Sequence, residues 1–268
     1  SELSNGTDVE DYYNLAQTLV PSDGKYSLVI SEFEREYSYI DQIKLLAIDH
    51  ELGTNIAMSP HGEILTYRNP AMPLSAVDNN GNNRLRAIRL MDGNVEDPST
   101  YFYGTPGDYL ILNFGRVNSR NAKLILRTDM IKEKECILIQ VKDRNGAWQT
   151  AETIIPRDYW SIEGVDLSSY LIRGQDLMVR LYWKYYHRID YVGLETTRQG
   201  NYEMHYANLL SATHSTIGDV KTLLTENDNT YAELAPNQQI QIDFNLPTNS
   251  REARTYILYV EGHYYTIS

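Results

Sequence analysis

The sequence has few residues that would support redox or covalent chemistry. Its 268 residues include one cysteine, Cys136, so no internal disulfide can form. Cys136 lies in an apolar stretch typical of a strand, where a free thiol usually behaves as a small buried apolar group. CxxC, HExxH, GxSxG and phosphate-loop patterns are missing, and the six histidines show no metal-ligand spacing. We therefore expect a protein that is not an enzyme.

Positive charge is also in short supply. The chain has 24 Lys and Arg against 36 Asp and Glu, a formal net charge of −12. Proteins that bind nucleic acids gain much of their affinity from Lys and Arg, so the sequence predicts no nucleic-acid partner. No apolar run reaches the ~18 residues of a membrane span, which predicts no membrane insertion. Cations, neutral sugars and protein partners remain open.

Phenylalanine and tryptophan are scarce, whereas tyrosine is abundant. There are 22 Tyr, 4 Phe and 3 Trp. Tyrosine joins an apolar ring to a polar tip, so it suits half-buried sheet faces and contact surfaces. The composition therefore favours a sheet protein with extensive amphipathic faces.

Short β-branched and aromatic runs separated by Asn, Asp, Gly and Pro indicate an all-β chain. The predicted strands span 26–31, 39–48, 63–67, 84–90, 108–114, 122–128, 136–141, 149–155, 177–186, 188–195, 202–210, 239–245 and 254–262. "LSSYL" and "IGDVKTLL" are predicted as single helical turns, and "VEDYYNLAQTL" (9–19) is the one candidate for a longer helix. This many strands at this spacing predict a sandwich or a barrel.

Two internal similarities suggest two related β units. "YIDQIKL" (39–45) and "RIDYVGL" (188–194) share Ile-Asp-x-[Ile/Val]-x-Leu, and residues 19–26 and 224–231 share Leu-x-x-x-Asp-x-x-Tyr. The acid of the first pattern suggests either a capping hydrogen bond or a cation site at the sandwich rim. We expect a main sandwich over 51–200 and a second β unit built from 1–50 and 201–268.

The segments "GDYLILNFG", "AKLILRTDM", "ILIQVKDRNGAW", "VDLSSYL", "LMVRLYW" and "RIDYVGLE" resemble the galactose-binding-like jelly-roll sandwiches. That superfamily includes carbohydrate-binding modules and discoidin-type domains. Residues 39–50, 215–224 and 256–265 are also faintly similar to regions of secreted proteins that carry FG-GAP repeats, although those repeats are missing here. The resemblance implies a jelly-roll-like antiparallel β-sandwich with a second, smaller β unit. It also implies secreted binding or adhesion, often with a structural calcium.

One candidate ligand site lies where strand 177–186 meets strand 188–195. Alternation along the first strand predicts that Trp183 packs inward. The candidate ligand-binding residues, which offer exposed rings beside hydrogen-bonding groups, are Tyr182, Lys184, Tyr186, His187 and Arg188. The alternative is a tyrosine-rich outer sheet that another domain or subunit covers.

Two acidic turns are candidate calcium sites, because calcium prefers carboxylate, amide and carbonyl oxygens. The candidate ligands are Asp78, Asn80, Asn82, Asp92, Asn94 and Asp97. The first turn is not an EF-hand loop, since Gly81 and Arg89 occupy positions that such a loop does not allow. Ordinary polar turns have the same composition, so both interpretations stay open.

These observations favour a non-catalytic extracellular or cell-surface protein that acts through protein contacts. We expect self-association into a homopolymer, as a surface or filament subunit, with residues 1–15 as an arm that adds a strand to a neighbour. The chain begins at Ser1 without a signal peptide, which fits a mature protein whose leader was removed or a shortened form. The alternatives are a carbohydrate-binding or adhesion module and, third, a glycoside hydrolase whose carboxylates lie far apart in sequence.

Overall fold

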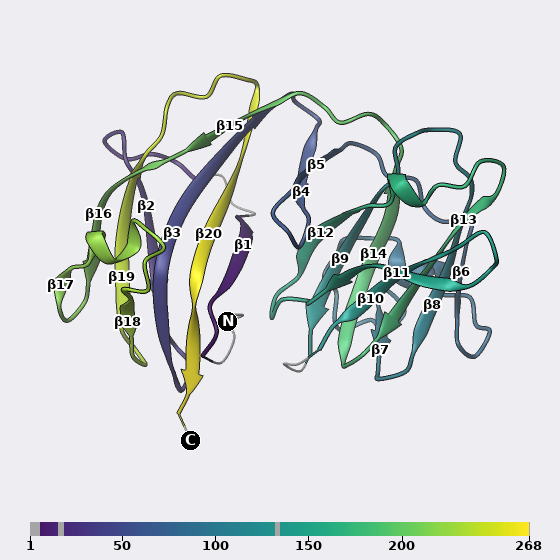
Figure 1. The fold of residues 1–268 in the computed structure, drawn as a ribbon, viewed down its shortest axis with the longest axis horizontal. Helices are drawn as coiled ribbons and strands as arrows, with labels where there is room; N and C mark the ends of the chain where they lie inside the picture. Colours follow the sequence, from purple (N-terminus) through teal and green to yellow (C-terminus); the bar gives the residue numbers. More distant parts are fainter. Residues whose placement is uncertain (1–5, 16–18, 132–134, 268) are drawn as a thin grey trace. The chain divides into compact units, whose positions relative to one another are not determined.

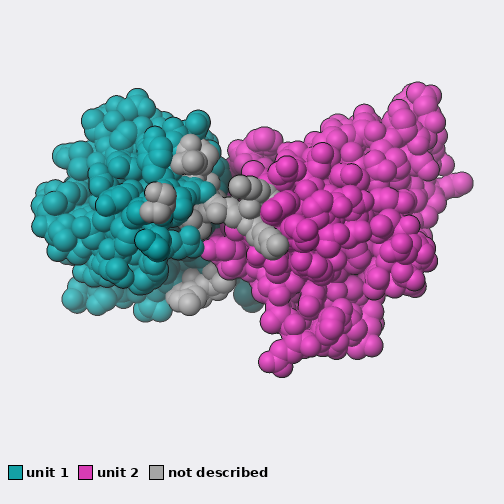
Figure 2. All heavy atoms as spheres, turned by 90° about the horizontal axis from the view of Figure 1, so that it is seen from below, with its two compact units in different colours: residues 1–52, 201–268 teal, residues 53–200 magenta. Residues whose placement is uncertain are grey.

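Strands, short 3-10 turns and loops make up the computed structural model, which describes residues 6–15, 19–131 and 135–267 (Figure 1). The chain is all-β, as the sequence predicts. It divides into two units: unit 1 comprises Ser1–Leu52 and Asn201–Ser268, and unit 2 comprises Gly53–Gly200 (Figure 2). Within the described ranges, no helix is long and apolar enough to cross a membrane.

Unit 2 is a β-sandwich of two sheets. In the described residues, the strand orders are β5-β4-β12-β9-β14-β7 and β11-β10-β13-β8-β6. Its elements are β4 (Asn55–Met58), β5 (Ile64–Tyr67), β6 (Ser75–Asp78), η1 (Leu85–Ile88), β7 (Phe102–Gly104), β8 (Tyr109–Arg116), β9 (Lys123–Met130), β10 (Ile137–Lys142), β11 (Trp148–Ile154), β12 (Ser161–Asp166), η2 (Ser168–Tyr170), β13 (Asp176–Trp183) and β14 (His187–Glu195).

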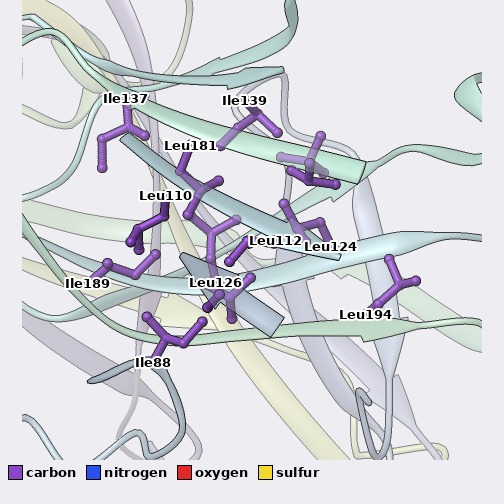
Figure 3. Packing of buried hydrophobic residues seen from close by; sticks show 14 of the residues in the cluster. Ile88, Leu110, Leu112, Leu124, Leu126, Ile137, Ile139, Leu181, Ile189 and Leu194 are labelled. Carbon is purple, nitrogen blue, oxygen red and sulfur yellow. The ribbon is translucent and has the colours of Figure 1, made fainter. Parts of the chain in front are cut away.

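The core of unit 2 follows from strict alternation along its strands. In β13, every second side chain from Leu177 to Trp183 is buried, because successive side chains of a strand point to opposite faces. The labelled leucines and isoleucines, which come from both sheets and from η1, pack together in the core (Figure 3). Trp183 is 0% exposed and its Nε1 donates to the His187 carbonyl oxygen over 3.1 Å. The inward position predicted for Trp183 is confirmed.

Unit 1 combines elements from both ends of the chain. One sheet has the order β1-β20-β3-β15, with β18 also paired to β3, and the other has the order β17-β16-β19-β2. Figure 1 shows β3 and β20 side by side along most of their length. The elements are β1 (Val9–Leu15), β2 (Tyr26–Ser31), β3 (Glu36–His50), β15 (Tyr202–Tyr206), β16 (Asn208–His214), β17 (Gly218–Asp219), η3 (Lys221–Leu224), β18 (Ala232–Leu234), β19 (Gln239–Asn245) and β20 (Ala253–Thr266).

Two sequence predictions about local structure are wrong. Residues 84–90 do not form a strand, because Asn83 Oδ1 accepts a hydrogen bond from the Leu85 amide (2.9 Å) and starts the turn η1 instead. The helix predicted over 9–19 is also wrong, because residues 9–15 form strand β1, which pairs antiparallel with β20. The arm expected over residues 1–15 stays a prediction. Residues 1–5 and 16–18 lie outside the described ranges. The helical turns predicted in "LSSYL" and "IGDVKTLL" are confirmed as η2 and η3.

Candidate functional site

The first candidate calcium turn is held together by hydrogen bonds within the protein. Asp78 is 4% exposed, and its carboxylate accepts the backbone amides of Asn80 and Asn82, each over 2.9 Å. It also pairs with Arg84 Nε at 2.8 Å. Burial alone would raise the pKa of Asp78, but these bonds outweigh it and lower the pKa to about 2. The carboxylate therefore caps the turn and neutralises an arginine.

The second candidate calcium turn has the same character. Asp92 Oδ1 accepts the Asn94 amide over 2.9 Å, and Asn94 Oδ1 accepts the Glu96 amide over 3.0 Å. Asp97 Oδ1 accepts both the amide and the hydroxyl of Ser99. The side-chain oxygens of this turn thus hold its own backbone. In residues 6–15, 19–131 and 135–267, no group of three His, Cys, Asp or Glu side chains is placed to hold a metal ion.

The structure does not bring the five candidate ligand residues together. Tyr182 belongs to β13, and Lys184 and Tyr186 lie in the turn that follows it. His187 and Arg188 begin β14, which belongs to the other sheet of unit 2. Although these residues are close in sequence, they are therefore divided between two separate sheets and the turn that joins them.

His187 lies in the interior rather than on a surface. It is 0% exposed, and its Nε2 donates to the Glu135 carbonyl oxygen over 3.0 Å. Burial lowers the pKa of the imidazole, so His187 is neutral at physiological pH. This histidine supports the packing of unit 2 and is not placed to contact a ligand.

Arg188 is neutralised on the outer side of the six-stranded sheet. Its Nε lies 2.8 Å from Asp129 Oδ2, and its guanidinium lies 5.6 Å from the ring centres of both Tyr101 and Trp160. The neighbouring Arg127 similarly pairs with Asp190 at 3.0 Å. Both arginines of this sheet already have a carboxylate partner, so their charge is not available to an external anion.

The five-stranded sheet of unit 2 presents a different surface, which we call the cationic ring face. The face consists of Tyr109, Gln140, Trp148, Arg180 and Tyr182. Strand register brings these side chains together: Arg180 lies opposite Gln140, and Tyr182 lies opposite Tyr109. Lys142 and Lys184 border the face, 5.7 Å from the Trp148 ring and 6.0 Å from the Tyr182 ring.

Arg180 is the central group of the cationic ring face. Its Nε donates to Gln140 Oε1 over 2.7 Å. Its guanidinium lies 4.8 Å from the Trp148 ring centre and 5.8 Å from those of Tyr109 and Tyr182. Within the described part of the chain, no carboxylate pairs with it. Gln140 and the rings therefore orient an un-neutralised cation on a half-buried aromatic surface.

Sequence reasoning found only part of this face. Alternation placed Arg180, Tyr182 and Lys184 on one side of their strand. Tyr109 lies 71 positions before Arg180 and Trp148 lies 32 positions before it. The pairing register that aligns their strands is not visible in the sequence. The available signal was the alternation of charged and aromatic residues on the polar side of the predicted strand 177–186.

A tyrosine and histidine cluster in unit 1 was also missed. Asp8 Oδ2 accepts a hydrogen bond from Tyr231 Oη over 2.8 Å, and Asp8 Oδ1 lies 2.6 Å from His263 Nδ1. The His263 ring stacks on Tyr39 at 5.0 Å, and Tyr265 meets both rings edge-on. Burial and the nearby Asp8 raise the pKa of Tyr231 to about 12. These groups satisfy one another, so the cluster ties the residue before β1 to β3 and β20.

Comparisons with known proteins do not identify the chain. No family model matches it, and no curated protein matches it. A solved structure of T=1 particles derived from infectious bursal virus shows a likeness that covers 100% of this chain and 79% of that chain, with 9% identity and a TM-score of 0.19. A likeness this weak carries no argument about fold or function, so any function must be argued from the surface itself.

Proposed function

We propose that this chain is a non-catalytic, extracellular β-sandwich protein that acts through protein contacts, as a self-assembling subunit of a cell surface or filament. The observation that carries the proposal is the cationic ring face. Tyrosine, tryptophan and arginine are the residues most enriched at the energetically dominant centres of protein interfaces. Here they form one half-buried patch around Arg180.

Charge favours another copy of the chain as the partner. The protein carries a net charge of −12, so acidic side chains outnumber basic ones, while the cationic ring face carries Arg180, Lys142 and Lys184. Opposite potentials on two copies attract and orient them. A contact between the cationic face of one copy and an acidic surface of the next is heterologous, and such contacts propagate into rings or filaments.

Sedimentation of Arg180→Gln tests this proposal. Glutamine removes the charge but keeps hydrogen-bonding capacity, and we expect the contact to weaken by about tenfold or more, the equivalent of roughly 1.4 kcal/mol. Arg120→Gln, an exposed arginine in the loop between β8 and β9, is the matched control for loss of one positive charge. Assembly of wild type and control, but not of Arg180→Gln, supports the proposal. Equal assembly of all three contradicts it.

A carbohydrate-binding or adhesion module is the second candidate, and the same face favours it. Sugar rings stack on tyrosine and tryptophan, while Arg180 and Gln140 offer donors suited to a carboxylated sugar. A glycan array that shows acidic-glycan binding by monomeric wild type, lost in Arg180→Gln and in Tyr182→Ala, would select this function over self-assembly. Tyr186→Ala is the control, because Tyr186 lies in the turn after β13 and meets the Tyr185 ring edge-on.

A further inference from the structure

The two units place the same motif at the same structural feature. Ile-Asp-x-[Ile/Val]-x-Leu lies on β3 in unit 1 and on β14 in unit 2. The pairing of β3 with β20 skips Asp41, and the pairing of β14 with β9 skips Asp190, so each acid is the extra residue of a β-bulge. Each is 0% exposed. The motif therefore marks one position in two related sheets.

The loops that reach these acids also correspond. Asp41 accepts the Asn229 amide over 3.1 Å, and Asp190 accepts the Gly93 amide over 3.0 Å. Both amides come from the loop that follows a 3-10 turn, η3 in unit 1 and η1 in unit 2. The acids thus cap a loop, as one of the two sequence interpretations proposed.

The strands before these turns correspond in sequence as well. Residues 71–78 ("AMPLSAVD") and 207–214 ("ANLLSATH") are identical at four of eight positions. The Arg84 amide donates to the Ala76 carbonyl (2.8 Å), and the Val220 amide donates to the Ala212 carbonyl (2.9 Å), closing the same turn in both units. The match therefore extends from sequence to individual backbone bonds.

The turns that precede β8 and β19 match in the same way. Asp108 Oδ2 accepts the Thr105 amide over 2.9 Å, and Gln238 Oε1 accepts the Ala235 amide over 2.8 Å. Each turn then bonds to the neighbouring strand of its sheet. The Asp108 carbonyl accepts the amide of Trp183 at the end of β13, and the Gln238 carbonyl accepts the amide of Glu32, which directly follows β2. β2 in unit 1 is consequently the counterpart of β13 in unit 2.

We infer that unit 1 is a circularly permuted counterpart of unit 2. The elements β16, η3, β18, β19, β20, β1, β2 and β3 correspond in turn to β6, η1, β7, β8, β9, β12, β13 and β14. Among these positions, the described part of unit 1 has no counterpart of the β10–β11 hairpin. In unit 2 that hairpin pairs with the outer edge of β13. The corresponding edge of β2 has no strand partner in the described residues.

The side chains of β2 show the effect of the missing strand. In unit 2, Leu177, Val179 and Leu181 are 5%, 0% and 0% exposed. Their counterparts Tyr26, Leu28 and Ile30 face the core of unit 1 but are only half-buried. Burial of apolar surface is favourable at roughly 25 cal/mol per Å², so a strand added at this edge would complete the core.

The backbone of β2 is suited to receive that strand. The Glu32 amide and carbonyl bond to Gln238 and Asn237 on the β19 side. Because antiparallel pairing alternates along a strand, the amides and carbonyls of Ser27, Val29 and Ser31 point to the open edge. No charged residue or proline interrupts residues 26–31, although natural edge strands usually carry such protection.

We propose that the open edge of β2 pairs antiparallel with the β2 of a second copy. The sequence Ser27-Leu28-Val29-Ile30-Ser31 is self-complementary about its centre. Val29, which is 57% exposed, would face the partner's Val29, each Leu28 would face an Ile30, and each Ser27 a Ser31. This two-fold contact deepens the proposed self-assembly, on which it rests, through a surface separate from the cationic ring face.

Disulfide trapping tests the register directly. In a Cys136→Ser background, Val29→Cys places two thiols opposite each other at a hydrogen-bonded antiparallel pair, where Cα atoms lie about 5.5 Å apart and a disulfide can form. We expect oxidation to give a covalent dimer. Ser27→Cys alone is the matched control and should stay monomeric, whereas Ser27→Cys combined with Ser31→Cys should cross-link.

The outcomes separate this inference from the proposed function. Cross-linking of Val29→Cys and of the double variant, but not of Ser27→Cys, supports the β2 pairing, even where Arg180→Gln abolishes larger assemblies. A Val29→Cys chain that stays monomeric on oxidation while wild type assembles through Arg180 overturns the β2 pairing and leaves the proposed function standing. A wild-type chain that does not assemble, together with a Val29→Cys variant that does not cross-link, overturns both.

Discussion

Glu163 gives unit 2 a pH-dependent stability that can be measured. It lies on β12 opposite Leu126 of β9, where Thr128 Oγ1 donates to its carboxylate over 3.2 Å and Ser161 Oγ donates to its other oxygen. Burial of the carboxyl group raises its pKa from 4.5 to about 7, although these hydrogen bonds oppose the shift. The folded state therefore favours the protonated acid.

The sign and size of the effect follow from linkage. Because the folded pKa lies above the unfolded pKa, the folded state holds its proton to higher pH, and stability is lost as pH rises from about 4.5 through about 7. A shift of 1 pKa unit corresponds to 1.36 kcal/mol, so the loss is at most roughly 3 kcal/mol at pH 8.5. The glutamine side chain of Glu163→Gln cannot ionise, so this variant should not lose stability in this way.

Urea unfolding of wild type and Glu163→Gln at pH 4, 6 and 8.5 measures this difference. Tryptophan fluorescence reports on unit 2 alone, because Trp148, Trp160 and Trp183 all lie there. We expect similar stabilities at pH 4 and a more stable variant at pH 8.5. Glu96→Gln, at an exposed position, is the control and should follow wild type. A stability gap that does not change between pH 4 and pH 8.5 would refute the reasoning.

Two further predictions concern packing and a buried ion pair. Gly104→Ala should destabilise unit 2 by about 1–3 kcal/mol in urea unfolding followed by fluorescence, because an added Cβ would overlap the Trp183 ring; an unchanged midpoint would contradict this. Burial raises the pKa of Asp49, but bonds from Arg254 and Ser250 lower it to about 2. The stability of the chain, followed by circular dichroism, should therefore fall as pH drops from about 4 to 2. Asp49→Asn should be less stable than wild type at pH 7 and should lose less stability in acid.

The all-β class and much of the strand pattern were predictable from local sequence. The strand at 26–31 agrees with β2, and alternation fixed which side of β13 packs inward. The segment 84–90 was wrongly predicted as a strand because its apolar residues alternate. The hydrogen bond from the Leu85 amide to Asn83 Oδ1 favours a turn instead. Such a bond depends on one side-chain position and leaves no periodicity to detect.

The candidate sites were harder to predict because they depend on which strands pair. The acidic turns at 78–82 and 92–97 have the composition of a calcium loop, but their oxygens accept the amides of their own turns. The Tyr182 to Arg188 stretch looked like one surface, yet the chain changes sheets within it. Conversely, the surface around Arg180 needs the register of β8, β10 and β13, which only the fold supplies.

The division of the chain was suggested by a repeated motif. The main sandwich was expected over residues 51–200, and unit 2 of the structure spans Gly53–Gly200. The repeated motif contains Asp41 and Asp190, the extra residues of the two β-bulges. Each of these acids accepts a hydrogen bond from a loop amide of its own unit. What the repeat could not show is that the elements of unit 1 occur in permuted order, with the edge of β2 left open.

Sedimentation velocity of the wild-type chain over a range of concentrations, at low and at high salt, tests the central claim most directly. The account predicts complexes that grow with concentration and shrink as salt screens the contact around Arg180. A single monomeric species at every concentration and salt would contradict the claim that this protein works by binding to copies of itself.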